Sequence, residues 1–324
     1  MTRLKQFDIL KGIGILAVLV GHIGVSGFPR SFIYGFHMPL FFFCSGVFYK
    51  NKPIGDVIIS GIRQLLIPYL FFLTVYNIVS WSLLIFHGSS FFEAISVVLS
   101  RNNIINYDSN IYKTIWFLPC LFFVKVVYSL LRRFFKSGIV VFSITALLYF
   151  VDCFFLDTPL FGDTILCVLL FYCLGDLFSS IKNKFSCDGG FCMSIVLLGL
   201  YIFAVFILRP SIDLKGNIFP WYTVFLSCLG IGAFYSVSCL LAKIKNPIVD
   251  LLVLCGEGSL VVFGLHRALW LVLNVCLSKF ELPYSIFALI QFVSALAVLL
   301  PVYVFLKNKC PFLVGRKSVS VHSS

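Results

Sequence analysis

The chain contains 324 residues, of which 60% are hydrophobic and only 12% are charged. Soluble domains carry about 45–50% apolar and about 25% charged residues, so the composition excludes a soluble globular enzyme. It also excludes a disordered chain, which needs low hydrophobicity and high charge. The net charge is +12, but the basic residues form small clusters between apolar runs. This distribution argues against nucleic-acid binding and is typical of a multi-span membrane protein.

Each apolar run predicts a helix, because a spanning segment must satisfy its own backbone hydrogen bonds. A span needs about 20 residues, so about ten spans leave room for loops and short tails but not for a soluble domain. We therefore predict an all-α polytopic membrane protein with one transmembrane domain over 1–310 and a short cytoplasmic tail over 311–324. The predicted spans are 10–28, 31–49, 65–87, 114–131, 138–156, 160–179, 191–208, 219–242, 248–277 and 284–306.

The Lys and Arg residues alternate across the predicted loops with a strong bias toward one side. The side opposite the N-terminus holds only Arg30, Arg101, Lys113, Arg209, Lys215 and Lys279. By the positive-inside rule both termini are cytoplasmic and the number of spans is even. The longest outside loop, 88–113, is polar and rich in asparagine, and it is the candidate for a lid or for acceptor contacts.

The chain has 12 cysteines. Most of them fall inside apolar runs, and neither a CxxC pair nor a Cys/His cluster with zinc spacing occurs among them. We interpret them as small buried hydrophobic residues. The sequence therefore predicts neither a metal site nor a disulfide framework.

The first apolar run carries the densest set of ionisable groups, which are functional candidates wherever they lie within the membrane. Lys11 and His22 share one helical face and lie about 16 Å apart along the axis. Asp8 is one turn before Lys11 on nearly the same face. The alternatives are a core histidine bonded to a neighbouring helix and an interfacial Asp8–Lys11 pair.

His37 lies early in the second run, shortly before Pro39, which loosens a helix. A short connection between the first two runs places His22 and His37 in the same outer half. An interfacial histidine beside a proline kink is the structural alternative for His37.

Four later residues are weaker candidates. The structural alternative for Arg63 is a cytoplasmic anchor that follows the positive-inside rule. The structural alternative for Trp116 is a place in the aromatic belt at the membrane interface. Glu257 and His266 lie in one apolar run and are costly there unless paired.

At these residues the sequence resembles the acyltransferase-3 family of membrane-integral O-acyltransferases. The first two motifs together are specific, and the later ones are weak individually. The matching segments are Lys11-x10-His22, Phe36 to Gly46, Arg63 with Leu66 to Tyr69, Trp116 to Leu118, and Gly256 to His266.

The resemblance implies a ten-helix bacterial inner-membrane enzyme that uses cytoplasmic acetyl-CoA to acetylate a hydroxyl of a surface polysaccharide or lipid-linked glycan. It assigns catalysis to His22, with His37 and Asp8, and CoA binding to Lys11 and Arg63. Substrate contacts fall to Trp116, Glu257 and His266. Many members carry Arg-x-x-Arg at the third span, whereas Arg63 has Leu66 three residues on, so Lys50, Lys52 or Arg132 with Arg133 are alternative phosphate contacts.

The chemistry leaves two routes open. His22 acts as a general base on the acceptor hydroxyl, or it forms a transient acyl-histidine. One competing function is a secondary transporter, although the sequence has no paired repeats of the kind that transporters show. The other is a catalytically silent partner in a glycan assembly.

Overall fold

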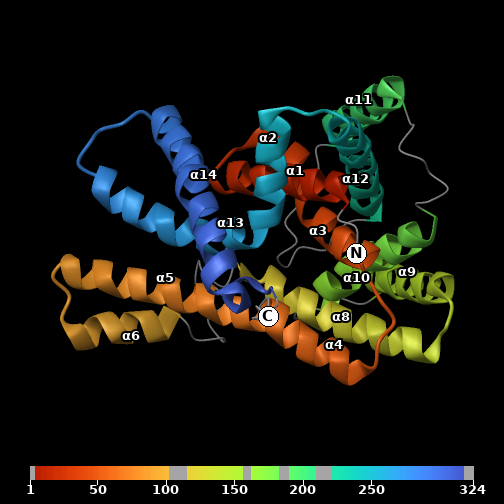
Figure 1. The fold of residues 1–324 in the computed structure, drawn as a ribbon, viewed down its shortest axis with the longest axis horizontal. Helices are drawn as coiled ribbons and strands as arrows, with labels where there is room; N and C mark the ends of the chain where they lie inside the picture. Colours follow the sequence, from red (N-terminus) through yellow and green to blue (C-terminus); the bar gives the residue numbers. More distant parts are fainter. Residues whose placement is uncertain (1–3, 102–114, 156–161, 182–189, 209–220, 317–324) are drawn as a thin grey trace, which may run out of the picture. The chain divides into compact units, whose positions relative to one another are not determined.

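The computed structural model describes residues 4–101, 115–155, 162–181, 190–208 and 221–316. Regular structure in this described part is helical, without a strand (Figure 1), which confirms the all-α prediction. The helices are α1 (Lys5–His22), α2 (Gly27–Tyr34), α3 (His37–Val47), α4 (Ile54–Gly61), η1 (Ile62–Leu66), α5 (Ile67–Phe86), α6 (Phe91–Arg101), α8 (Phe117–Phe134), α9 (Gly138–Phe155), α10 (Gly162–Ile181), α11 (Phe191–Leu208), α12 (Trp221–Ala242), α13 (Pro247–Leu277), α14 (Tyr284–Lys309) and η2 (Pro311–Val314).

Within the described ranges, 5 helical segments are long and apolar enough to cross a membrane. They are Ile54–Phe86, Phe191–Leu208, Tyr222–Ala242, Pro247–Leu277 and Tyr284–Lys309. Two shorter apolar helical stretches are Gly138–Val151 and Ile165–Ser180. The count of about ten spans and the cytoplasmic position of both termini stay predictions.

Contacts divide the chain into two compact units. The first unit combines residues 1–57 with 123–259, and the second combines residues 58–122 with 260–324. Each unit has its own core and its own candidate residues.

In the first unit, α1 is in contact with α3, α12 and the first part of α13. Glycines set the closest of these contacts. A Cβ on Gly12 would collide with the carbonyl of Leu252, and a Cβ on Gly256 would collide with the carbonyl of Asp8. The two helices therefore meet backbone to backbone, as small residues permit in membrane helix pairs.

The second predicted span, 31–49, is divided in the structure. Helix α2 ends at Tyr34 and α3 begins at His37. Pro39 explains the division, because a proline cannot donate to the carbonyl four residues earlier, which belongs to Gly35. The hydroxyl of Ser227 donates to that carbonyl at 2.6 Å instead. The first predicted span, 10–28, is also shorter in the structure, since α1 ends at His22.

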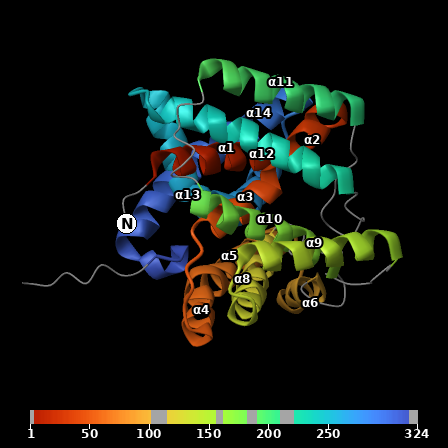
Figure 2. The same ribbon diagram turned by 90° about the vertical axis from the view of Figure 1, so that its right-hand side faces the viewer.

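Two further helix pairs close the first unit. Gly46 of α3 and Gly175 of α10 each leave no space for a Cβ against the backbone of the other helix. Helices α11 and α12 lie side by side in both views (Figure 2), and the hydroxyls of Ser194 and Ser236 are 2.6 Å apart between them. Tyr201 of α11 donates to the carbonyl of Phe32 at 2.5 Å, which fixes α2.

The third predicted span, 65–87, starts too late. One continuous helical segment runs from Ile54 to Phe86 and contains a π-helical stretch, Ile62–Leu66. Pro68 follows this stretch. Its missing N–H leaves the carbonyl of Gln64 without a helical donor, and such interruptions loosen the local winding.

The second unit packs α5, α14 and the second part of α13 around aromatic side chains. Phe72 is fully buried against Gly264, and Trp270 donates to the carbonyl of Gln291 at 2.9 Å.

Helix α6 occupies part of the predicted loop 88–113; residues 102–114 lie outside the described ranges. It starts with a capping box, because the Ser90 amide donates to Glu93 at 2.9 Å and thereby lowers the pKa of that carboxyl.

Candidate functional site

Asp8 and Lys11 form an ion pair at the start of α1. The Lys11 Nζ lies 2.9 Å from Oδ1 of Asp8, and the Asp8 side chain is only 10% exposed. The spacing of three residues places both groups on one face of the helix. Their shared face was predicted from the sequence, and the structure brings them into direct contact.

Glu257 belongs to the same end of α1. It is half-buried on α13, and the preceding residue, Gly256, contacts the Asp8 backbone. The structure therefore places the backbone of this predicted substrate-binding residue one position from the contact with Asp8.

His37 is buried at the first turn of α3, with 4% of its surface exposed. Its Nδ1 lies 2.8 Å from the carbonyl oxygen of Ile33. A carbonyl only accepts, so Nδ1 carries the hydrogen and donates it. The neutral ring then has its lone pair on Nε2, which is the nitrogen able to take up a proton.

Tyr34 connects the segments that carry the two histidines. Its ring packs edge to face against His37, with the ring centres 5.0 Å apart. Its hydroxyl donates to the carbonyl of Gly21 at 3.5 Å, one residue before His22, the half-buried last residue of α1. The guanidinium of Arg30 lies over the same tyrosine ring at 5.1 Å. The sequence indicated that His22 and His37 lie in one region but not that Tyr34 lies between their segments.

Helix α3 runs back along α1 from this end. Gly14 of α1 is close to Leu40 and Phe41. Phe48, which directly follows α3, packs its ring against that of Phe7, the residue before Asp8, with the ring centres 5.3 Å apart. The histidine end and the Asp8–Lys11 end are thus the two ends of one antiparallel helix pair.

Arg63, Trp116 and His266 belong to the second unit. Arg63 is exposed in the π-helical stretch, and Trp116 directly precedes α8. His266 is fully buried, and its Nδ1 donates to carbonyls of its own helix at 2.9 and 3.0 Å. The rings of Trp270 and His266 pack nearly at right angles, with their centres 4.9 Å apart, so the structure places His266 in a packed interior.

A buried polar cluster in the first unit was not predicted from the sequence. Tyr128 of α8 donates to Oδ2 of Asp176 on α10 at 2.5 Å, and Nε of Arg132 lies 3.6 Å from the same oxygen. The tyrosine rings of Tyr49 and Tyr172 flank Tyr128. The available signal was an aspartate inside an apolar run, which is costly without a partner.

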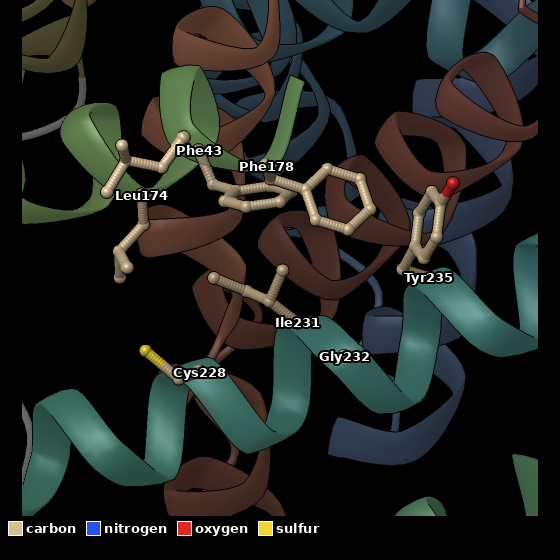
Figure 3. A pocket seen from close by; sticks show the side chains of 8 residues that line it. Phe43, Leu174, Phe178, Cys228, Ile231, Gly232 and Tyr235 are labelled. Atoms are coloured by element: carbon tan, nitrogen blue, oxygen red, sulfur yellow. The ribbon is translucent and has the colours of Figure 1, made fainter. Parts of the chain in front are cut away.

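An apolar cavity of about 290 Å³ lies between α3, α10 and α12 (Figure 3). The rings of Phe43 and Phe178 lie together at its wall, 5.5 Å apart. Tyr235 also lines the cavity, and its ring contacts that of Phe7, the residue before Asp8. The lining offers little polar chemistry, so the reactive groups are those of α1 and α3.

In the described part of the chain, no three His, Cys, Asp or Glu side chains gather in a way that suits a metal ion. The side chains that the structure places at the two ends of α1 are imidazoles, a carboxylate and cations. This set suits proton transfer at one end of the helix pair and anion binding at the other.

The described part of the chain thus combines helices of membrane-spanning length with histidines at one end of α1 and an ion pair at the other. Residues 4–306 match the family model described as an acyltransferase domain. The chain therefore belongs to the acyltransferase-3 family.

The chain is also similar to the nodulation protein NolL of Mesorhizobium japonicum, with 29% identity over 194 residues. The alignment covers 55% of this chain and 48% of that protein, so the chain spans about half the length of this curated relative. No solved structure matches the chain.

Proposed function

We propose that the protein is a membrane O-acetyltransferase that transfers an acetyl group from acetyl-CoA to a sugar hydroxyl of a surface polysaccharide or lipid-linked glycan. The proposed location is a bacterial inner membrane, with the donor on the cytoplasmic side. The observation that carries the proposal is the arrangement around Tyr34, which connects His37 to the end of α1 at His22.

In the proposed reaction, the acceptor oxygen attacks the thioester carbonyl while His22 takes the hydroxyl proton. The C–S bond then breaks, and the CoA thiolate leaves and recovers that proton. His22 ends α1, and the negative end of a helix dipole stabilises a positive charge, which suits an imidazole that must become protonated. The Lys11–Asp8 pair at the other end supplies a cation for the donor.

The donor is long enough to connect the two ends. Lys11 and His22 are separated by about 16 Å along α1, and the mostly uncharged pantetheine arm lies between the phosphates and the thioester of acetyl-CoA. The phosphates then stay near Lys11 while the acetyl group reaches His22. Trp116, Glu257 and His266 stay proposed acceptor contacts, and Arg63 a proposed donor contact.

The test uses purified full-length protein, labelled acetyl-CoA and a crude lipid-linked glycan extract. Replacing His22 by alanine lowers label transfer by about 10²–10⁴-fold, the range of a lost general base. The matched control is His87→Ala, which removes an exposed histidine after α5 and leaves the rate unchanged. Equal rates for His22→Ala and the wild type would contradict the assignment of His22.

The covalent route has its own test. If His22 carries the acetyl group, label accumulates on the protein when acceptor is omitted, and it is absent from His22→Ala. Repeated absence of protein-bound label in the wild type favours direct transfer.

A further inference from the structure

The proposed reaction makes no use of the apolar cavity between α3, α10 and α12 (Figure 3). Its volume is about 290 Å³, and all of its lining residues belong to the first unit. Of the eight residues that line it, only Cys228 and Tyr235 have a heteroatom in the side chain. Cavities with such walls hold apolar ligands and do not retain water.

Gly232 keeps one side of this cavity open. A Cβ at Gly232 would meet no atom within 4 Å, whereas a Cβ at the nearby Gly230 would collide with the side chains of Phe36 and Tyr201. One glycine of α12 therefore serves close packing, and the other leaves space. The cavity has about twice the volume of the 150 Å³ cavity that binds one benzene molecule, so it accommodates about ten to twelve carbon atoms.

The cavity opens toward the surroundings of the helices. Six of its eight lining residues keep part of their surface accessible, while Phe43 and Ile231 are buried. Helix α12 is long and apolar enough to cross a membrane, and α10 contains a shorter apolar stretch. The medium around such helices in a membrane is hydrocarbon. The cavity is therefore placed and lined to take up a hydrocarbon chain.

Two walls of the cavity are connected to the segment that carries His37. Phe43 follows His37 by six residues on α3, which is about 9 Å along the helix axis. On α12, the residue before Tyr235 is Phe234, and its ring stacks on that of Phe36 with the ring centres 4.2 Å apart. A lipid with its tail at Phe43 and its head toward the start of α3 brings its polar part to the level of His37.

We propose that this cavity binds the hydrocarbon tail of the acceptor, so that the acceptor is a lipid-linked glycan and not a polysaccharide without a lipid. The inference rests on the proposed function, which leaves both acceptor classes open. The tail holds the acceptor in the first unit, and its sugar hydroxyl reaches the histidine end.

The first experiment measures binding without any transfer. Full-length protein in phosphatidylcholine nanodiscs is irradiated with a polyprenyl phosphate that carries a diazirine in its tail, and labelled peptides are identified by mass spectrometry. We expect label within residues 174–178 and 228–235. Gly232→Leu fills the cavity and loses most of this label. The matched control is Gly199→Leu in α11, where a Cβ also meets no atom within 4 Å, and it keeps the label.

Cys228→Phe fills the same cavity from one turn before Gly232, and we expect it to lose the label as Gly232→Leu does. Absence of label from both peptides in the wild type, or equal label in the wild type and the two filled variants, overturns the site. A bilayer lipid is the other source of a hydrocarbon chain. If phosphatidylcholine with a diazirine in its acyl chain labels these peptides and excess polyprenyl phosphate does not reduce that label, the assignment to the acceptor is overturned.

The second experiment measures acetyl transfer to the same glycan in two forms, lipid-linked and released from its lipid. We expect Gly232→Leu to raise the KM for the lipid-linked form about tenfold, which corresponds to about 1.4 kcal/mol of binding free energy. Its KM for acetyl-CoA and its rate with the released glycan stay unchanged. Equal KM values for the lipid-linked form in Gly232→Leu and Gly199→Leu contradict the proposal.

The two experiments separate this proposal from the proposed function, because labelling needs no acetyl donor. Label in the cavity without any acetyl transfer supports the tail site and contradicts the transferase reaction. Acetyl transfer without label in the cavity supports the reaction and overturns the site.

Discussion

At the scale of single residues, the hydrogen bond of His37 determines which of its nitrogens is able to act. Nδ1 donates to the carbonyl of Ile33, so proton uptake falls to Nε2. An asparagine at this position keeps a donor near Nδ1 and removes Nε2. We therefore expect His37→Asn to keep the wild-type unfolding temperature and to lose about 10²-fold or more in acetyl transfer, as for a lost acid–base group.

His87→Asn is the matched control for this prediction and keeps full activity. If His37→Asn retains wild-type turnover, the role of His37 is confined to packing against Tyr34 and to the Ile33 bond. Activity and thermal unfolding measured on the same preparations separate these two roles.

Local spacing predicted some contacts of the site and not others. The Asp8–Lys11 pair could be predicted because residues three apart face each other on a helix. The bond between Tyr128 and Asp176 joins residues 48 apart in separate apolar runs, and no periodic pattern connects them. For the same reason, the position of Tyr34 between the two histidine segments followed only from the tertiary structure.

At the scale of helices, the contact between α1 and α13 depends on the absence of side chains. A Cβ on Gly256 would collide with the carbonyl of Asp8. The colliding atoms of Asp8 belong to the backbone, so they cannot move aside as the end of a flexible side chain can. Overpacking of this kind costs about 1–3 kcal/mol. We expect Gly256→Ala to lower the unfolding temperature in detergent and, because the shift moves Asp8, to reduce acetyl transfer.

Gly199→Ala in α11 is the control, since a Cβ there meets no atom within 4 Å. Alanine is the better helix former by about 1 kcal/mol, so this variant is as stable as the wild type or more stable. A Gly256→Ala protein that unfolds like Gly199→Ala would show that α1 and α13 are not in backbone contact.

Helix boundaries were the least predictable part of the fold. Apolar composition joined α2 and α3 into one span, because hydrophobicity is continuous across Gly35 and Phe36. The break depends on Pro39 and on the Ser227 hydroxyl that takes its place as donor to Gly35. The proline was visible in the sequence, but its distant partner was not.

At the scale of the whole molecule, the short helix α3 determines whether the charge alternation holds. Its 11 residues span about 16 Å, which is less than the hydrocarbon core of about 30 Å. Nevertheless the chain returns to the start of α1 after α3, where the rings of Phe48 and Phe7 lie 5.3 Å apart. We therefore predict that α1, α2 and α3 make one crossing and one return, and that Lys50 and Lys52 lie on the side where α1 begins.

We therefore predict that the long helix Ile54–Phe86 starts on the same side as the N-terminus, and the charge bias predicts that both termini are cytoplasmic. An epitope tag after Ser324 should be accessible to antibody only in permeabilised spheroplasts. A tag in the turn between α13 and α14, next to Lys279, should be accessible in intact spheroplasts, because it lies on the opposite side. An N-terminal tag serves as the control and should behave like the C-terminal tag. A C-terminal tag exposed in intact spheroplasts would mean an odd number of spans and would contradict the prediction.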